Sequence, residues 1–328
     1  MRVLILHPGA LGDIILSLPA IGILRDRYTG ARITLAANTD FTDAVASGYA
    51  DQTLSLSALP LHRLYRSDIL PSEDALFWRS FDRIVSWTGS DAALFASKLE
   101  QHHPCSLVAS WKPDVDEPRH VSRLFVDSLG PWLPCPRTIP RPEIRVDMAA
   151  RARGQEWLRA QGLRPETPIV AIHPGAGSIA KRWPPARYRE LIRRLCIFTN
   201  VLVVEGPAEP GLGREIVSNT GPNSALASCL PLPLLAAVLS GCRTYVGNDS
   251  GIAHLAAGLA VACVVLFGPT PPRNWAPIGS HVTVLQDIGG CAACAGGQGM
   301  PHSCLENISS SDVFYATTKV VTAISDAL

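Results

Sequence analysis

The tetrapeptide His-Pro-Gly-Ala occurs twice, in "RVLILHPGALGD" (residues 2–13) and in "PIVAIHPGAGSIAKRW" (residues 168–183). Each copy follows a short apolar run, Val3–Leu6 or Ile169–Ile172, and precedes apolar residues at helical spacing. A short apolar run that leads through Pro-Gly into a helix is typical of a buried parallel strand, a tight turn and a helix. The repeat therefore predicts two similar α/β halves.

The helix after the first copy contains Pro19, which we expect to kink or locally open it. In the second copy, Pro184 and Pro185 suit the first turn of a helix. Further strands are predicted from short apolar runs at Arg32–Leu35, Arg83–Ser86, Val201–Val204, Thr244–Val246 and Cys263–Phe267.

The predicted fold class is α/β, with two Rossmann-like, doubly wound domains that face a central cleft. The segment 129–142, "LGPWLPCPRTIPRP", holds five prolines and is predicted to be the linker. The domains are then residues 1–142 and 143–328. A helix over Asp312–Leu328 ends the chain, with a return to the first domain left open.

Composition gives no reason to expect a nucleic-acid or membrane partner, because 29 basic and 28 acidic residues leave a formal charge of +1 over 328 residues. No stretch approaches the roughly 18 apolar residues of a membrane span, and the start lacks the features of a signal peptide. We expect a cytoplasmic protein, with peripheral association at the inner membrane left open.

The second half carries the densest polar signals. Gly175, Gly177 and Ser178 could surround a phosphate, with Lys181 or Arg182 as the cation. A plain tight turn explains these glycines equally well. Neither repeat matches G-x-G-x-x-G or a P-loop, which disfavours a dehydrogenase or a kinase.

A second polar turn, "GNDSG" (residues 247–251), again stands between a predicted strand and a helix. Asp249 or Ser250 is expected to cap that helix, and the N–H groups of Ser250 and Gly251 could meet a second phosphate. Taken alone, capping is the simpler interpretation, and His254 is a structural histidine unless it faces the cleft.

Four segments, in order, resemble the motifs of the bacterial heptosyltransferases, glycosyltransferase family 9. They are "HPGALGDIILSLPAIGILR", "HPGAGSIAKRWP", "GNDSGIAHLAA" and "LFGPTPP". The resemblance implies a GT-B fold and transfer of a heptose from ADP-heptose to a lipopolysaccharide core acceptor, with inversion at the anomeric carbon. Helix N-termini and Lys181 could neutralise the departing diphosphate, so we expect no metal or other cofactor to be required.

The resemblance also implies roles for single residues. Asp13 matches the proposed catalytic base, and Lys181 matches the lysine that neutralises the donor pyrophosphate. Asp249, Ser250, Gly251 and His254 match the donor-site turn, and Glu209 lies near the ribose-binding acid.

Two groups of residues have competing interpretations. Arg63 and Arg66 suit an anionic sugar-lipid acceptor, although a solvated surface is the preferred interpretation. Cys291, Cys294, His302 and Cys304 include a Cys-x-x-Cys that could bind zinc, although a structural loop is the preferred interpretation.

Other functions stay open on the same scaffold. They are a GT-B transferase with another nucleotide sugar, a nucleotide-sugar-binding protein without turnover, and a sugar-nucleotide epimerase. Nothing derived from the residues alone identifies the base or the sugar of the donor.

Overall fold

The computed structural model describes residues 1–114, 119–164, 166–218, 220–287 and 304–323, with the helical residue 323 described by its backbone only. The chain divides into two compact units, Met1–Arg145 and Val146–Leu328. Each unit is described by itself.

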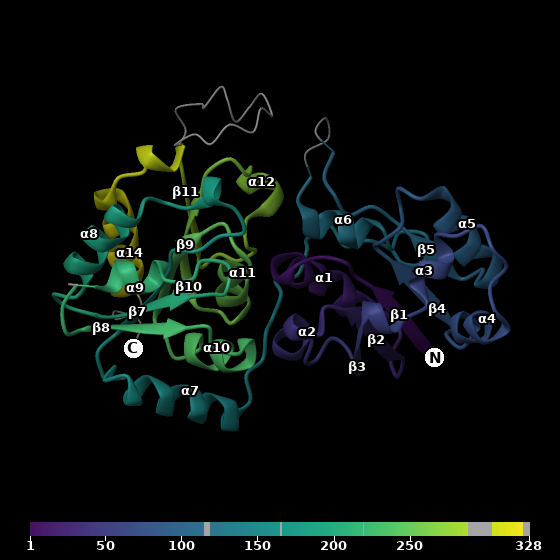
Figure 1. Ribbon diagram of the computed structural model, residues 1–328, viewed down its shortest axis with the longest axis horizontal. Helices are drawn as coiled ribbons and strands as arrows, with labels where there is room; N and C mark the ends of the chain where they lie inside the picture. Colours follow the sequence, from purple (N-terminus) through teal and green to yellow (C-terminus); the bar gives the residue numbers. More distant parts are fainter. Residues whose placement is uncertain (115–118, 165, 219, 288–303, 324–328) are drawn as a thin grey trace. The chain divides into compact units, whose positions relative to one another are not determined.

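The first unit is built on a parallel sheet of five strands in the order β3-β2-β1-β4-β5 (Figure 1). The strands are β1 (Arg2–Leu6), β2 (Arg32–Ala37), β3 (Gln52–Ser55), β4 (Arg83–Ser86) and β5 (Ser106–Val108). β1 pairs with both β2 and β4, so the strand that ends at the first His-Pro-Gly-Ala copy lies at the centre of the sheet.

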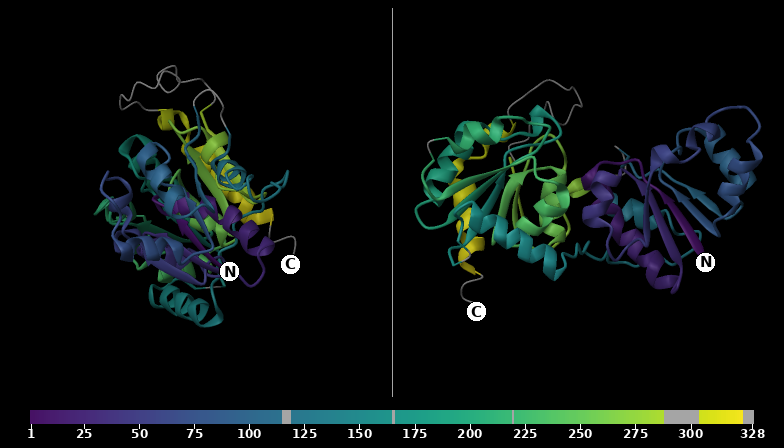
Figure 2. Two further views of the ribbon diagram at one scale, coloured as in Figure 1. Left: turned by 90° about the vertical axis from the view of Figure 1, so that its right-hand side faces the viewer. Right: turned by 60° about the horizontal axis from the view of Figure 1, so that its bottom comes forward.

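Helices cover both faces of this sheet, as the right-hand view of Figure 2 shows. α1 (Leu11–Arg27) packs with α2 (Thr39–Val45) and α6 (Val121–Asp127), while α5 (Ala93–His102) packs with α3 (Leu61–Leu64) and α4 (Ser72–Arg79). The side of α3, α4 and α5 is filled by large apolar residues, including Trp78 and Phe95, both fully buried. Such burial of aromatic side chains is a main source of stability.

The second unit has a parallel sheet of six strands in the order β11-β10-β9-β6-β7-β8. The strands are β6 (Ile169–His173), β7 (Asn200–Glu205), β8 (Ser224–Ser228), β9 (Thr244–Asn248), β10 (Ala262–Phe267) and β11 (Val282–Gln286). β6 is again central, between β7 and β9. Two parallel doubly wound sheets confirm the α/β fold class.

Helices also lie on both sides of the second sheet (Figure 1). α8 (Pro185–Leu195) packs with α9 (Leu212–Val217) and α14 (Ser310–Ala323), while α10 (Leu232–Leu239) packs with α7 (Met148–Ala160) and α11 (Gly251–Gly258). A short helix, α12 (Pro272–Trp275), follows β10. Val313 and Val321 of α14 belong to the hydrophobic core beside α8. This helix therefore packs within the second unit, whereas the sequence left open whether it returns to the first.

One proline of the repeats differs from expectation, and another agrees with it. α1 continues as one helix from Leu11 to Arg27 with Pro19 inside it, so the proline, at which a kink or a local opening was expected, does not end the helix. Pro185 is the first residue of α8, where its missing N–H costs no helical hydrogen bond, as predicted. No helix in the described part of the chain is long and apolar enough to span a membrane.

Candidate functional site

The polar turns of the second unit follow neighbouring strands at the point where the strand order of the sheet reverses. The chain proceeds from β6 outward through β7 and β8, then returns to β9 on the other side of β6. Loops that leave two such neighbouring strands diverge, and the crevice at their carboxyl ends is the usual ligand site of a doubly wound sheet. His173 lies beside Gly247 in the β6–β9 pairing, so residues 174–178 and 249–251 follow adjacent strand ends.

The two glycines of the turn after β6 have different surroundings. A Cβ atom on Gly175 would overlap the carboxyl group of Glu209, whereas one on Gly177 would meet no atom within 4 Å. Gly177 and Ser178 are exposed, and a short 3₁₀ turn, Ile179–Lys181, follows them. The first glycine therefore serves packing, and the second leaves open space beside the backbone.

Lys181 and Asp249 bridge the two turns. The Lys181 Nζ lies 2.7 Å from Asp249 Oδ2, and the two side chains are 32% and 8% exposed. A nearly buried carboxylate requires a charged partner, which Lys181 supplies. The ammonium stands at the strand ends and is accessible enough to meet an anion.

Asn248, the last residue of β9, fixes the geometry beneath these turns. Its Oδ1 accepts hydrogen bonds of 3.0 Å from Trp183 N and from the Tyr188 hydroxyl. Its Nδ2 donates to the Pro174 carbonyl at 2.8 Å and to the Gly175 carbonyl at 3.3 Å. One buried amide therefore ties the glycine turn to the start of α8.

Glu209, His173 and Ser250 form a chain of side chains across the same site. His173 Nε2 lies 3.1 Å from Glu209 Oε1, and His173 Nδ1 lies 3.3 Å from Ser250 Oγ. Gly206 N also donates to Glu209 Oε1, at 2.8 Å. Burial raises the pKa of the Glu209 carboxyl, but the hydrogen bonds from His173 and Gly206 outweigh it, so the pKa lies below its usual value.

The start of α11 corrects one expectation. Ser250 is the N-cap residue, but its side chain makes no capping hydrogen bond, since its Oγ lies against His173. The side chain of the cap therefore leaves the first backbone N–H groups of the helix to other acceptors, and the positive end of the helix dipole adds to their attraction for an anion. Gly251 begins the helix, and His254, in its first turn, is 5% exposed.

In the first unit, Asp13 lies in the first turn of α1. Its Oδ2 accepts a hydrogen bond of 2.9 Å from Ala10 N, which holds the carboxylate over the turn of the first His-Pro-Gly-Ala copy. A Cβ atom on Gly9 would crowd both Asp13 and His7. The turn and the carboxylate are thus packed as one piece.

His7 occupies the position that His173 holds in the second unit, at the end of the central strand, but it is fully buried. Its ring lies 5.6 Å from Trp87, 6.0 Å from Trp111 and 5.3 Å from Phe125, measured between ring centroids. Its Nδ1 accepts a 3.0 Å hydrogen bond from Gly9 N. Burial lowers the pKa of His7 to about 3, so the ring is neutral at physiological pH.

The remaining sequence candidates lie elsewhere. Arg63 Nε is 3.8 Å from Asp74 Oδ2, and Arg66 Nε is 3.0 Å from Asp68 Oδ2, so both guanidinium groups have an acidic neighbour. Cys291, Cys294 and His302 fall outside the described residues, and Cys304 is buried. Within the described ranges, no group of three or more His, Cys, Asp or Glu side chains could hold a metal ion.

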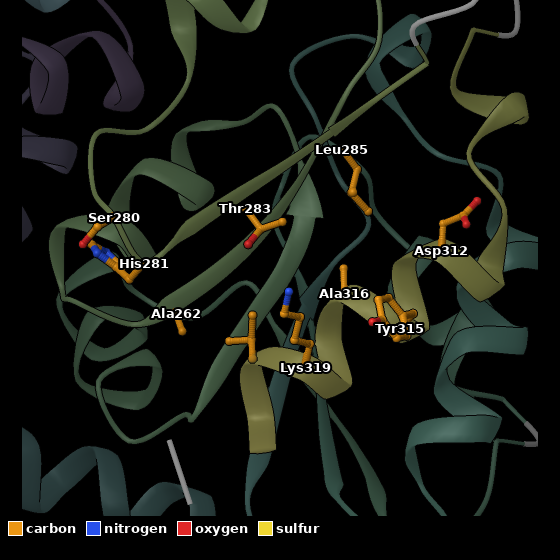
Figure 3. A pocket seen from close by; sticks show the side chains of 10 residues that line it. Ala262, Ser280, His281, Thr283, Leu285, Asp312, Tyr315, Ala316 and Lys319 are labelled. Atoms are coloured by element: carbon orange, nitrogen blue, oxygen red, sulfur yellow. The ribbon is translucent and has the colours of Figure 1, made fainter. Parts of the chain in front are cut away.

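A cavity of about 560 Å³ lies in the second unit between β11 and α14 (Figure 3). Its lining includes Ala262, which begins β10, and His281, which precedes β11. Lys319 and Tyr315 line it from α14. It therefore lies along the sheet edge, apart from the carboxyl ends of β6 and β9.

His7, His173 and Asn248 were not assigned a role from the sequence. The available signal was the repeat itself, because it places the same residue type at the end of both central strands. The two hydrogen-bond partners of His173, however, lie 36 and 77 residues further along the chain. The aromatic neighbours of His7 all lie beyond position 80. Sequence spacing does not show such contacts.

Comparisons with known proteins agree with this architecture. The model of glycosyltransferase family 9 (heptosyltransferase) matches residues 95–301. Lipooligosaccharide heptosyltransferase 2 of Haemophilus influenzae is 30% identical over 158 residues, which are 46% of this chain and 46% of that protein. The matched part is thus less than half of the relative's length.

Two solved structures share the fold. The family 9 glycosyltransferase from Veillonella parvula is 19% identical, with a TM-score of 0.81 over 98% of this chain and 97% of that one. ADP-heptose lipopolysaccharide heptosyltransferase II of Escherichia coli is 20% identical, with a TM-score of 0.76 over 99% of this chain and 100% of that one. The fold is therefore GT-B. Because the family model matches more than half of its residues, the chain belongs to glycosyltransferase family 9.

Proposed function

We propose that this protein transfers a heptose from ADP-heptose to a lipopolysaccharide core acceptor, with inversion at the anomeric carbon. The observation that carries the proposal is the convergence of two polar turns, after β6 and β9, on the switch point of the second sheet. Family membership supplies the reaction class, and these turns supply a place for the donor diphosphate.

The donor diphosphate lies, in this proposal, between the turn of Gly175, Gly177 and Ser178 and the start of α11. Backbone N–H groups of Ser250 and Gly251 hold one phosphate, and Lys181 neutralises charge on the departing ADP. Asp249 holds the Lys181 ammonium in place before the donor arrives. His254, in the first turn of α11, is buried beside this part of the chain.

Glu209 supports the donor site from behind. Its side chain is 3% exposed and its Oε1 is used by His173 and Gly206. The resemblance assigns this acid to the ribose, but a carboxylate that is buried and bonded to His173 and Gly206 serves better to orient its neighbours than to bind the ligand directly.

The first unit supplies the base and the acceptor site. Asp13 takes the proton from the acceptor hydroxyl as that oxygen bonds to the anomeric carbon and the bond to ADP breaks on the opposite face. Attack opposite the leaving group in a single step inverts the configuration. Arg63 and Arg66 are candidates for contact with an anionic acceptor.

Calorimetric titration with ADP, ADP-heptose, UDP and UDP-glucose, without added metal, tests the donor. Preferential binding of ADP and ADP-heptose is expected. Binding of uridine compounds alone would contradict the assigned donor. A transfer assay then checks for a heptosylated acceptor, because an altered donor sugar without transfer would indicate an epimerase, and binding without turnover a non-catalytic protein.

A further inference from the structure

The Glu209–His173–Ser250 chain has a direction that follows from the chemistry of its ends. An ionised carboxylate only accepts hydrogen bonds, so the His173 Nε2, 3.1 Å from Glu209 Oε1, must carry the hydrogen of that contact. In a neutral imidazole the other nitrogen, Nδ1, is then an acceptor. With the ring neutral, Ser250 Oγ, 3.3 Å from Nδ1, donates its hydroxyl hydrogen to His173.

This direction decides what Ser250 can offer to a ligand. A hydroxyl has one hydrogen and two lone pairs, and here the hydrogen is used within the protein. Ser250 is partly exposed, whereas His173 and Glu209 have side chains that are 6% and 3% exposed. The open end of the chain is therefore an acceptor, which suits a ligand hydroxyl and not a phosphate oxygen.

Neighbouring groups preserve the direction. Gly206 N donates to the same Glu209 oxygen as His173, and Arg182 Nη2 lies 4.0 Å from the other, so a backbone donor and a cation favour the ionised carboxylate. The Lys181 ammonium is paired with Asp249. Burial raises the pKa of the Tyr245 phenol, on β9, and outweighs the side-chain hydrogen bond with Ser250 that lowers it, so this neighbour is uncharged. With the Ser250 hydrogen directed to His173, the Tyr245 hydroxyl donates to one Ser250 lone pair, and the other remains for a ligand.

We infer that Glu209 and His173 are positioning residues that orient the Ser250 hydroxyl as a hydrogen-bond acceptor for a hydroxyl group of the ligand. The inference rests on the proposed function for the identity of that ligand, which carries hydroxyls on the ribose of ADP and on the transferred sugar. It adds a specificity contact to a turn whose backbone N–H groups are assigned to phosphate.

The direction of the chain can be measured in the protein without ligand. In protein labelled with ¹⁵N-histidine, the His173 signals are identified by their loss in His173→Gln. The expected result is a neutral ring with hydrogen on Nε2, and a changed tautomer balance in Glu209→Gln, whose amide can also donate. Hydrogen on Nδ1, or a doubly protonated ring near pH 7, would overturn the inference.

The ligand contact is tested by pairing Ser250→Ala with ligands that lack one hydroxyl. If Ser250 meets a ribose hydroxyl, the variant binds ADP about three- to tenfold more weakly, yet binds either 2′-deoxy-ADP or 3′-deoxy-ADP as the parent does. If Ser250 contacts the transferred heptose instead, Ser250→Ala weakens the binding of ADP-heptose only. His173→Gln, which keeps a group near Glu209 but none near Ser250, should show the same pattern and add little in the double variant.

Two controls keep the outcomes distinct. Ser218→Ala, whose exposed Oγ bonds only to the Glu215 carbonyl among the described residues, should change no affinity. Equal weakening of ADP, both deoxy-ADPs and ADP-heptose by Ser250→Ala would mean that Ser250 donates to phosphate, and would sink the inference. If the parent protein bound no adenosine nucleotide, the proposed donor would fail, while the tautomer measurement would still decide the direction of the chain.

Discussion

The histidines of the repeated tetrapeptide have different environments although their local sequence is the same. His7 lies among Trp87, Trp111 and Phe125, and His173 lies between a carboxylate and a hydroxyl. The sequence predicted both turns, because these depend on neighbouring residues. It did not predict the ring environments, because these depend on contacts between distant strands and loops.

The burial of His7 predicts a pH dependence of stability. The pKa of about 3 lies below the 6.5 of the unfolded chain, so the unfolded state binds more protons as pH falls between these values. This contribution to stability is complete above pH 6.5 and is lost as pH falls, by about 2 kcal/mol between pH 7 and pH 5. In denaturant unfolding at both pH values, His7→Phe should lose about 2 kcal/mol less than the parent. Equal losses would contradict a neutral buried ring.

Asp13→Asn should separate catalysis from donor binding. Asparagine keeps an oxygen that can accept from Ala10 N, so the turn is preserved, but it cannot take a proton from an acceptor hydroxyl. We expect kcat to fall by about 10²–10⁴ while ADP affinity changes less than about twofold. Asp26→Asn, exposed in the last turn of the same helix, is the matched control. A large loss of ADP affinity would place Asp13 at the donor.

Lys181→Ala should weaken ADP binding by about 1.5–3 kcal/mol, because it removes a charge-assisted contact to the diphosphate. It also leaves the nearly buried Asp249 carboxylate without its ammonium partner, which adds repulsion toward the ligand. Lys319→Ala, at the separate cavity beside β11, is the control and should leave affinity unchanged. Calorimetric titration with ADP compares the two variants. An unchanged ADP affinity in Lys181→Ala would remove this residue from the site.

At the scale of elements, the strands missed by the sequence are those at the sheet edges. Central strands such as β1 and β6 are apolar and buried along nearly their whole length, and their predicted bounds agree with the observed ones to within one residue. β3, β5, β8 and β11 stand at the ends of the two sheets and are mostly half-buried. Their mixed composition follows from facing solvent on one side, and periodicity does not separate them from loops.

The two glycines of the turn after β6 predict opposite outcomes for the same substitution. Gly175→Ala drives a Cβ atom into the Glu209 carboxyl, so Glu209 must move away from His173. We expect a loss of about 1–3 kcal/mol in stability, with weaker ADP binding. Gly177→Ala meets no atom within 4 Å and should leave stability within about 0.5 kcal/mol of the parent. Thermal unfolding checks both, and similar losses in the two variants would mean that the turn is not packed as described.

At the scale of the whole molecule, the division into two units predicts where ADP acts. The proposed donor residues, from Gly175 to His254, all belong to the unit Val146–Leu328. Bound ADP should slow amide hydrogen exchange in peptides that contain residues 174–183 and 248–258, because ligand binding disfavours their local opening. Peptides from residues 1–114 should be much less affected. Stronger protection in the first unit than in the second would contradict this assignment of the donor site.

The strand order also has a consequence for synthesis of the chain on the ribosome. β1 has both neighbours once β4 ends at Ser86, but β6 receives its second neighbour only when β9 ends at Asn248. At about 5–20 residues per second, the gap between His173 and Asn248 lasts several seconds. The central strand of the first sheet can acquire both neighbours early in translation, whereas the central strand of the second sheet keeps one edge unpaired during this interval. A chaperone that binds emerging chains has access to the unpaired edge of β6 during that time.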